Sequence, residues 1–208
     1  MLSVNGIHKS EQTIEKSRFL TYSSHVEGEE EARDFIAMVR SEHPLATHVC
    51  YAFVADKLGN LQRFSDDGEP SGTAGLPILD AVKKSGLFET CVCVVRYFGG
   101  IKLGAGGLVR AYSSSAAQNI AGAEKRDWRL CRMLSLTVGY GEFDALQTFL
   151  SKQNCEGKGT DYLDRVTCQV AVRSEETERF CAALVDYLNG KVQIFKKEEF
   201  FYPFPLAM

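Results

Sequence analysis

The sequence is organised around the stretch Arg63-Phe64-Ser65-Asp66-Asp67-Gly68-Glu69-Pro70-Ser71-Gly72-Thr73-Ala74-Gly75. A second glycine-rich stretch follows: Arg96-Tyr97-Phe98-Gly99-Gly100-Ile101-Lys102-Leu103-Gly104-Ala105-Gly106-Gly107-Leu108-Val109-Arg110-Ala111-Tyr112. Each stretch couples glycine to charged or hydroxyl side chains at the start of a predicted helix. Glycine permits positive φ and close backbone approach, and a helix start offers unbonded N–H groups and a positive dipole end. Both stretches therefore have features of a site for an anion such as phosphate.

Positive charge is concentrated in one segment of a mildly acidic chain. The 208 residues are enough for one or two domains, and 45% hydrophobic with 25% charged residues is typical of globular proteins. A net charge of −3 argues against a generally basic nucleic-acid-binding surface. Residues 91–112, however, contain three basic residues and no acidic one. A local basic site therefore remains compatible with the composition.

Cysteine usage and the N-terminal sequence both favour the cytoplasm. The seven cysteines include no C-x-x-C pair and lie mostly in apolar runs, as expected of buried thiols in a reducing compartment. Neither a signal peptide nor a run long enough to span a membrane is recognised. We expect a cytoplasmic protein with no membrane partner, no metal site and no cofactor.

Hydrophobic periodicity predicts alternating strands and helices in the first part of the chain. Ala32, Phe35, Ile36 and Val39 form one apolar helical face. The continuous apolar run at 90–98 is typical of a strand covered on both faces. The predicted strands are 13–26, 47–54 and 90–98, and the predicted helices are 29–41, 74–85 and 107–120. Strand alternation over 13–26 would place Lys16 and Arg18 on the same face.

A charged segment at 124–129 indicates a domain boundary, so we expect one domain at 1–127 and another at 128–208. The second domain has predicted strands at 131–139, 155–162, 164–172 and 191–201, with helices at 142–152 and 175–189. This βαββαβ order is ferredoxin-like. The predicted fold class is therefore α+β.

The basic glycine-rich loop is the candidate phosphate or nucleic-acid site. Neither standard nucleotide motif fits it, because Val109 replaces the last glycine of G-x-G-x-x-G and Lys102 is not followed by Ser or Thr. The context, a strand followed by a helix, still suits phosphate, while a tight structural turn remains the alternative. The predicted contacts are the side chains of Arg96, Lys102 and Arg110, the backbone N–H groups of Gly104, Gly106 and Gly107, and, as weaker additions, Lys16 and Arg18.

The acidic loop leaves three interpretations open. Asp66, Asp67 and Glu69 could hold a cation or act as acid and base. They could equally form a turn, with Ser71 or Thr73 capping the next helix. A docking surface for a partner is the third interpretation. No catalytic residue is assigned, and we interpret His43 and His48 as packing or capping residues because they do not form an HExxH motif.

The chain resembles the YigZ/IMPACT family in four blocks. These are 15–19 (Glu-Lys-Ser-Arg-Phe), 43–52 (His-Pro-Leu-Ala-Thr-His-Val-Cys-Tyr-Ala), 64–75 within the acidic stretch, and 95–112 across the glycine-rich stretch. The resemblance implies a first domain similar to domain IV of elongation factor G and a second similar to its domain V. Eukaryotic relatives regulate translation by binding the activator of the amino-acid-starvation kinase. No RWD domain, which carries that interaction, is recognised in these 208 residues, so this partner is not expected.

The sequence thus predicts a cytoplasmic regulator of translation that binds RNA or the ribosome, with a translation-related protein as a further partner and no DNA. An enzyme is less favoured. Bacterial members of the family have borne a proline-dipeptidase label, but no set of metal ligands for such an activity is recognised in this sequence. One alternative is a metal-assisted hydrolase, or another enzyme acting on a phosphorylated small molecule, in a cleft where the two loops meet. Another is a protein-docking module with exposed Asp66, Asp67 and Glu69. Fold similarity alone does not choose among these.

Overall fold

The predicted buried strand forms β6 (Thr90–Tyr97), the central strand of a sheet in the computed structural model, which describes residues 1–205. The strand order of this sheet is β2-β3-β6-β4-β5, and every pairing is antiparallel. The other strands are β2 (His8–Ile14), β3 (Ser17–His25), β4 (His48–Val54) and β5 (Gln62–Ser65).

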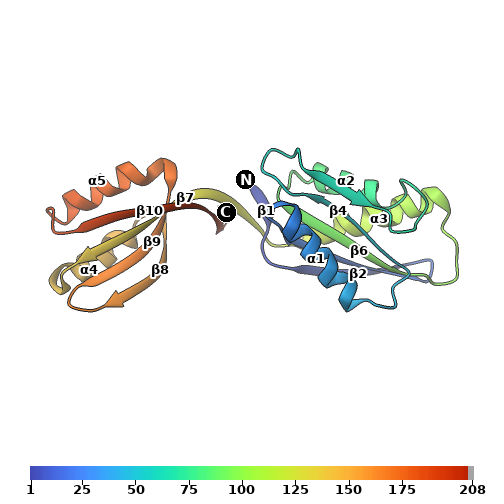
Figure 1. Ribbon diagram of the computed structural model, residues 1–208, viewed down its shortest axis with the longest axis horizontal. Helices are drawn as coiled ribbons and strands as arrows, with labels where there is room; N and C mark the ends of the chain where they lie inside the picture. The colour runs from blue at the N-terminus through green and yellow to red at the C-terminus, as the bar shows by residue number, and fades with distance from the viewer. Residues whose placement is uncertain (206–208) are drawn as a thin grey trace. The chain divides into compact units, whose positions relative to one another are not determined.

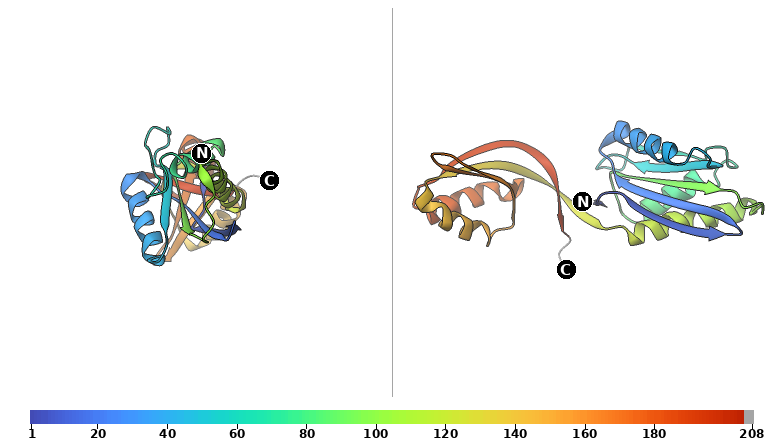
Figure 2. Two further views of the ribbon diagram at one scale, coloured as in Figure 1. Left: turned by 90° about the vertical axis from the view of Figure 1, so that its right-hand side faces the viewer. Right: turned by 90° about the horizontal axis from the view of Figure 1, so that it is seen from below.

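Helices cover both faces of this sheet, which explains why β6 is apolar throughout. Figure 2 shows α1 (Gly28–Glu42) on one face and α3 (Gly104–Gly122) on the other. Cys91, Cys93 and Val95 pack into the core on the α1 side. Val92 and Val94 point the opposite way, into a core shared with α3 and α2 (Gly75–Lys84). Alternate residues of β6 thus serve two separate cores.

The prediction of one strand over 13–26 is wrong, because a hairpin turn interrupts it. The turn connects β2 to β3 through Glu15 and Lys16, which have φ values of 44° and 63°. Two consecutive residues with positive φ match the twist of a tight hairpin, but neither is a glycine or asparagine, so the usual signal was absent. Lys16 therefore lies at the hairpin tip and not on a strand face beside Arg18.

The described residues divide into two compact units, seen in Figure 1. The first contains Met1–Asp127 together with Pro205, and the second contains Trp128–Phe204. The second unit has the βαββαβ order: β7 (Lys125–Val138), α4 (Tyr140–Leu150), β8 (Cys155–Tyr162), β9 (Val166–Arg173), α5 (Thr177–Tyr187) and β10 (Gln193–Pro205), with a short 3₁₀ helix (Ser174–Glu176) before α5. Its strand order is β10-β7-β9-β8, and β1 (Leu2–Val4) pairs with the first residues of β7.

Two further findings concern the length of the apolar helices and the state of the cysteines. Within residues 1–205, no helix combines the length and the apolarity needed to cross a membrane. All seven cysteines are free thiols. Burial raises the pKa of Cys50 to about 12, so this thiol stays protonated and unreactive near neutral pH.

We predict that Gly99→Ala destabilises the protein, because the hairpin turn packs directly on Gly99. A Cβ at this position would lie 2.0 Å from the Lys16 carbonyl oxygen, so the backbone must shift. The free energy of unfolding should fall by about 1–3 kcal/mol in urea denaturation.

The matched control is Gly106→Ala. A Cβ there would meet nothing closer than the Arg110 guanidinium at 3.8 Å. Since Gly106 is helical, alanine should leave stability unchanged or raise it by up to about 1 kcal/mol. Equal stability of the Gly99→Ala variant and the wild type would contradict the packing of the turn on the glycine-rich loop.

Candidate functional site

The glycine-rich loop becomes helical earlier than its glycines suggest. The sequence predicted a helix from 107, but α3 begins at Gly104, so Gly104, Gly106 and Gly107 form its first turn. No side chain caps this end of the helix. The first N–H groups of an α-helix have no intrahelical acceptor, and the dipole adds positive potential there. The start of α3 can therefore attract an anion.

Three exposed cations surround the start of α3. Lys102 precedes the helix, Arg110 lies on its second turn, and Lys16 is at the hairpin tip. The hairpin is held against the loop because the Gly99 N–H donates to the Ser17 hydroxyl at 3.2 Å. Within the part of the chain that the structure describes, none of the three cations has an ion-pair partner. Their charges are available to a ligand.

Two cavities adjoin this basic loop. The larger, about 490 Å³, is lined by Ile14, Glu15, Ile101, Lys102, Leu103, Gly107, Arg110, Ala111 and Ser114. The smaller, about 250 Å³, is lined by Glu69, Pro70, Arg96, Phe98, Lys102, Leu103, Gly104, Ala105 and Leu108. Lys102 and Leu103 line both cavities. The smaller one also brings the acidic loop and the glycine-rich loop together.

Arg96 differs from the other predicted phosphate contacts because it is buried. Only 4% of the residue is exposed, and its Nη1 donates to Glu69 Oε1 at 2.6 Å. Nη2 donates to the Ser17 hydroxyl at 3.3 Å. The Tyr112 hydroxyl donates to the same Glu69 oxygen at 2.7 Å. Arg96 is thus already paired inside the protein, where it joins β6, the acidic loop and the hairpin.

Asp66 serves the backbone of its own loop. Its carboxylate accepts the N–H groups of Gly72 at 2.8 Å, Ala74 at 2.9 Å and Gly75 at 2.8 Å. Burial alone would raise the pKa of Asp66, but the three N–H donors together hold this pKa below its usual value. Asp66 thus stabilises the start of α2.

The predicted cap by Ser71 or Thr73 is not what the structure contains. The Thr73 hydroxyl donates to the Pro70 carbonyl at 2.7 Å, and Ser71 is exposed. The residue before α2 is Ala74, which offers no capping side chain. Asp66, eight positions before Ala74, instead accepts the N–H groups at the start of α2. The sequence pattern did not indicate this capping role.

Asp67, the remaining acidic residue of the loop, is also bound by donors of the protein. Its Oδ1 accepts from Arg40 at 2.6 Å, and its Oδ2 accepts the Val49 N–H at 2.7 Å. Asp66, Asp67 and Glu69 are each occupied by different protein donors. They do not converge on one point, so the metal-assisted reaction at this loop finds no support in the geometry.

The two histidines considered in the sequence each contact other groups of the first unit. His48 Nδ1 lies 2.8 Å from the Asp67 carbonyl oxygen. His43 lies between two phenols, with its Nε2 2.6 Å from the Tyr22 hydroxyl and its Nδ1 2.9 Å from the Tyr97 hydroxyl. Their expected packing roles match these contacts.

Two other residues near the basic loop differ from their sequence interpretation. Arg18 forms a forked pair with Glu11, at 2.8 and 3.2 Å, so its charge is already balanced at the surface. Phe98, the last residue of the run 90–98 that we expected to be covered on both faces, is 46% exposed, whereas Tyr112 is fully buried. Phe98 follows the last residue of β6 and precedes two glycines, which was the one signal in the sequence that the covering layers end there.

Two family models match segments of this chain. Residues 15–120 match the model of the Impact N-terminal domain, and residues 136–191 match a domain of unknown function, DUF1949. The basic loop, the acidic loop and the hairpin tip all lie inside the first match.

Curated relatives match nearly the whole chain. "IMPACT family member YvyE" of Bacillus subtilis (strain 168) is 39% identical over 92% of this chain and 88% of its own. "IMPACT family member YigZ" of Escherichia coli (strain K12) is 38% identical over 90% of this chain and 93% of its own. A solved structure titled "Crystal structure of an hypothetical protein" is 35% identical, with a TM-score of 0.61, and covers 95% of this chain and 97% of that one.

We predict that Glu69→Gln strongly destabilises the protein. The change leaves the buried Arg96 guanidinium without its counter-charge, and such losses cost about 3–5 kcal/mol. Chemical denaturation measures the loss. Adding Arg96→Met to this variant should recover part of it, because the uncompensated charge is then absent.

The control for this ion pair is Glu11→Gln, which breaks the exposed pair with Arg18. Water screens exposed pairs, so the denaturation midpoint should not move measurably. A Glu69→Gln variant as stable as Glu11→Gln would refute the importance of the buried pair.

We predict that Asp66→Asn lowers stability by about 1–3 kcal/mol at pH 7, since an amide nitrogen cannot accept the N–H groups that the carboxylate binds. The pKa of Asp66 is lowered in the folded state, so its stabilisation is complete above about pH 4 and is lost as the pH falls through the folded-state pKa. The difference in unfolding free energy between wild type and variant should therefore stay constant from pH 7 to pH 5 and shrink in acid. A pH-independent difference would argue against capping by the ionised carboxylate.

Proposed function

The chain belongs to the IMPACT family, and from this premise we propose that it is a cytoplasmic regulator of translation that binds the phosphate backbone of RNA, free or in the ribosome. The proposed contacts are Lys102, Arg110 and Lys16, with the first-turn N–H groups of α3. Arg96 positions this surface from the interior, and Arg18 contributes less because Glu11 neutralises it.

The observation that carries this proposal is that, within the described residues, the acidic side chains near the site are paired within the protein and the exposed basic side chains around α3 are not. The acidic loop beside the site has its three carboxylates occupied by protein donors, whereas the three cations around α3 have no ion-pair partner among the described residues. In a chain with a net charge of −3, such unneutralised cations favour a polyanionic ligand.

Phe98 supports RNA rather than an isolated phosphate group. It lines the smaller cavity beside Lys102 and exposes 46% of its surface. An exposed ring next to cations can stack on a base of a single strand, which is a common feature of RNA sites. The similarity to domains IV and V of elongation factor G, implied by the family resemblance, belongs to the same proposal because that factor acts on the ribosome.

A second candidate function has one specific observation in its favour. The acidic and glycine-rich loops line one cavity of about 250 Å³, as expected for the alternative of a phosphorylated small molecule. Glu69 is already engaged by Arg96 and Tyr112 there, so this candidate is a binding site without an assigned catalytic group.

We predict that Lys102→Ala/Arg110→Ala weakens binding to a single-stranded oligoribonucleotide and to ribosomes. If each residue neutralises one phosphate, the slope of log affinity against log salt should flatten by about 1.4. Fluorescence anisotropy over a salt series measures the slope, and co-sedimentation with ribosomes tests the larger partner.

The charge-matched control is Lys83→Ala/Lys84→Ala, which removes two exposed cations from the last turn of α2. It should retain the wild-type affinity and slope. Equal RNA binding by both double variants would overturn the proposed site. Ribosome association that survives nuclease treatment would instead indicate a protein partner, and competition by a phosphorylated metabolite without RNA binding would favour the second candidate.

A further inference from the structure

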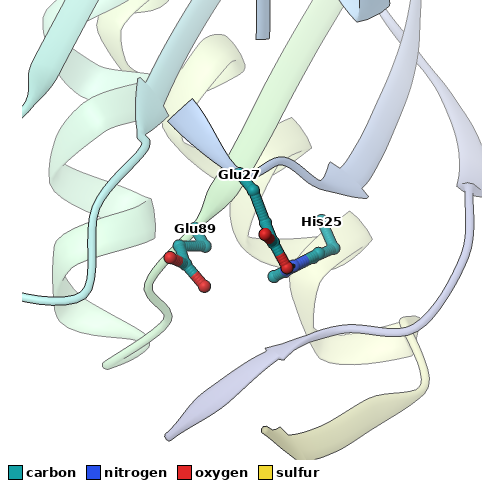
Figure 3. Close-up of side chains that lie close together, drawn as sticks. All are labelled: His25, Glu27 and Glu89. Atoms are coloured by element: carbon teal, nitrogen blue, oxygen red, sulfur yellow. The ribbon is translucent and has the colours of Figure 1, made fainter. Parts of the chain in front are cut away.

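A second polar cluster lies at the other end of the first sheet. β3 runs from Ser17, beside the glycine-rich loop, to His25, which pairs with Thr90 at the start of β6. His25 lies seven positions after Arg18, roughly 24 Å along an extended strand. Figure 3 shows His25, Glu27 and Glu89 drawn together at this end, from β3, from the residue before α1 and from the residue before β6. A site here is independent of the proposed RNA surface.

Glu89 is an unusual residue to bury at this place. It is 4% exposed, and its Oε2 has no hydrogen-bond partner within the described residues 1–205. Its φ is 47°, a strained value for a residue with a side chain. Its carbonyl oxygen, held by the Val26 N–H at 2.8 Å, fixes this conformation. A carboxylate buried this deeply needs a cation near it to remain ionised.

The hydrogen bonds of Ser3 determine how the ring of His25 is protonated. The Ser3 hydroxyl lies 3.1 Å from the Glu89 carbonyl oxygen and 3.0 Å from the Thr90 hydroxyl. The Thr90 hydroxyl also donates to the Phe88 carbonyl at 2.8 Å. Ser3 therefore gives its one proton to Glu89 or Thr90, and must accept from His25 Nδ1, which is 2.8 Å away. The lone pair of neutral His25 is then on Nε2.

Nε2 faces the two carboxylates. It lies 3.5 Å from Glu27 Oε1, and one ligand atom from each of His25, Glu27 and Glu89 falls within 4.8 Å of the others. Ligands about 2.1 Å from a tetrahedral zinc ion lie about 3.4 Å apart. Ser3 orients the ring as the outer hydrogen-bond partner of a metal-bound histidine does.

We propose that His25, Glu27 and Glu89 form a binding site for a divalent transition metal ion of the zinc class. One imidazole and two carboxylates suit such an ion, whereas magnesium and calcium favour oxygen ligands alone. Three protein ligands leave a coordination position for water or for a ligand. Sequence reasoning did not find this set because Glu89 is 64 residues from His25 and matches no spacing motif.

In the metal-free protein, the positive charge beside Glu89 is the ammonium group of Lys57. Its Nζ lies 3.7 Å from Glu89 Oε1 and its side chain, between β4 and β5, is 37% exposed. Asp56 and Glu31 add negative charge near Glu89 and His25. A metal ion and the ammonium group would repel each other, so Lys57 must turn toward solvent when metal binds. Removing Lys57 should therefore strengthen binding, which a purely structural cluster does not predict.

Titration calorimetry of the full chain, treated with a chelator and then with zinc chloride, tests the site. We expect one equivalent to bind, and His25→Gln or Glu89→Gln to weaken binding at least about tenfold. Lys57→Met should tighten it by about fivefold or more. Glu30→Gln, an exposed acid in the first turn of α1, should change nothing.

Two further measurements distinguish this site from misfolding of a variant and from zinc bound by cysteines. Glu27 is exposed, so Glu27→Gln should fold normally and still weaken binding if a buried variant fails to fold. Cobalt in place of zinc should give a visible spectrum without a thiolate charge-transfer band, since the partly exposed Cys155 and Cys181 are the competing ligands. Absence of stoichiometric binding, unchanged affinity in the ligand variants, or a thiolate band would each overturn the proposal.

Discussion

The first unit depends on one buried ion pair, Glu69 with Arg96, completed by the Tyr112 hydroxyl. The three groups come from the acidic loop, β6 and α3, and Ser17 adds the hairpin through its bond to Arg96. Each segment could adopt other local conformations alone. Because a buried charge is costly without its partner, the pair couples their positions to one another. The exposed basic residues around the start of α3 lie on the segments whose positions this ion pair couples.

The sequence predicted the parts of the fold that depend on local periodicity. The buried strand β6 and helices α1 and α2 lie close to their predicted positions, since their apolar spacing decides them. The hairpin at Glu15 and Lys16 was missed because tertiary contacts impose positive φ on residues that do not favour it. The roles of Asp66 and Arg96 were missed for a similar reason, since their partners are not identifiable from spacing.

For the candidate site too, the sequence indicated local features but not the contacts that depend on the folded chain. The concentration of positive charge at 91–112 is a property of the sequence, and two of its three basic residues, Lys102 and Arg110, are exposed in the structure. Which cations are already neutralised depends on the folded chain: Arg18 meets Glu11 across the hairpin, and Arg96 meets Glu69 across the core. Likewise, Phe98 is exposed and Tyr112 is buried, although both lie in the same stretch.

The central place of β6 has a consequence for the synthesis of the chain. The bond between Ser17 and Arg96 joins residues 79 positions apart, and β6 lies between β3 and β4. The hairpin of β2 and β3 can form early, but both β3 and β4 wait for β6 to emerge before their inner edges are paired. Contacts of such sequence separation slow folding. During translation the nascent N-terminal half therefore spends a period with open strand edges, when it is most in need of protection from association.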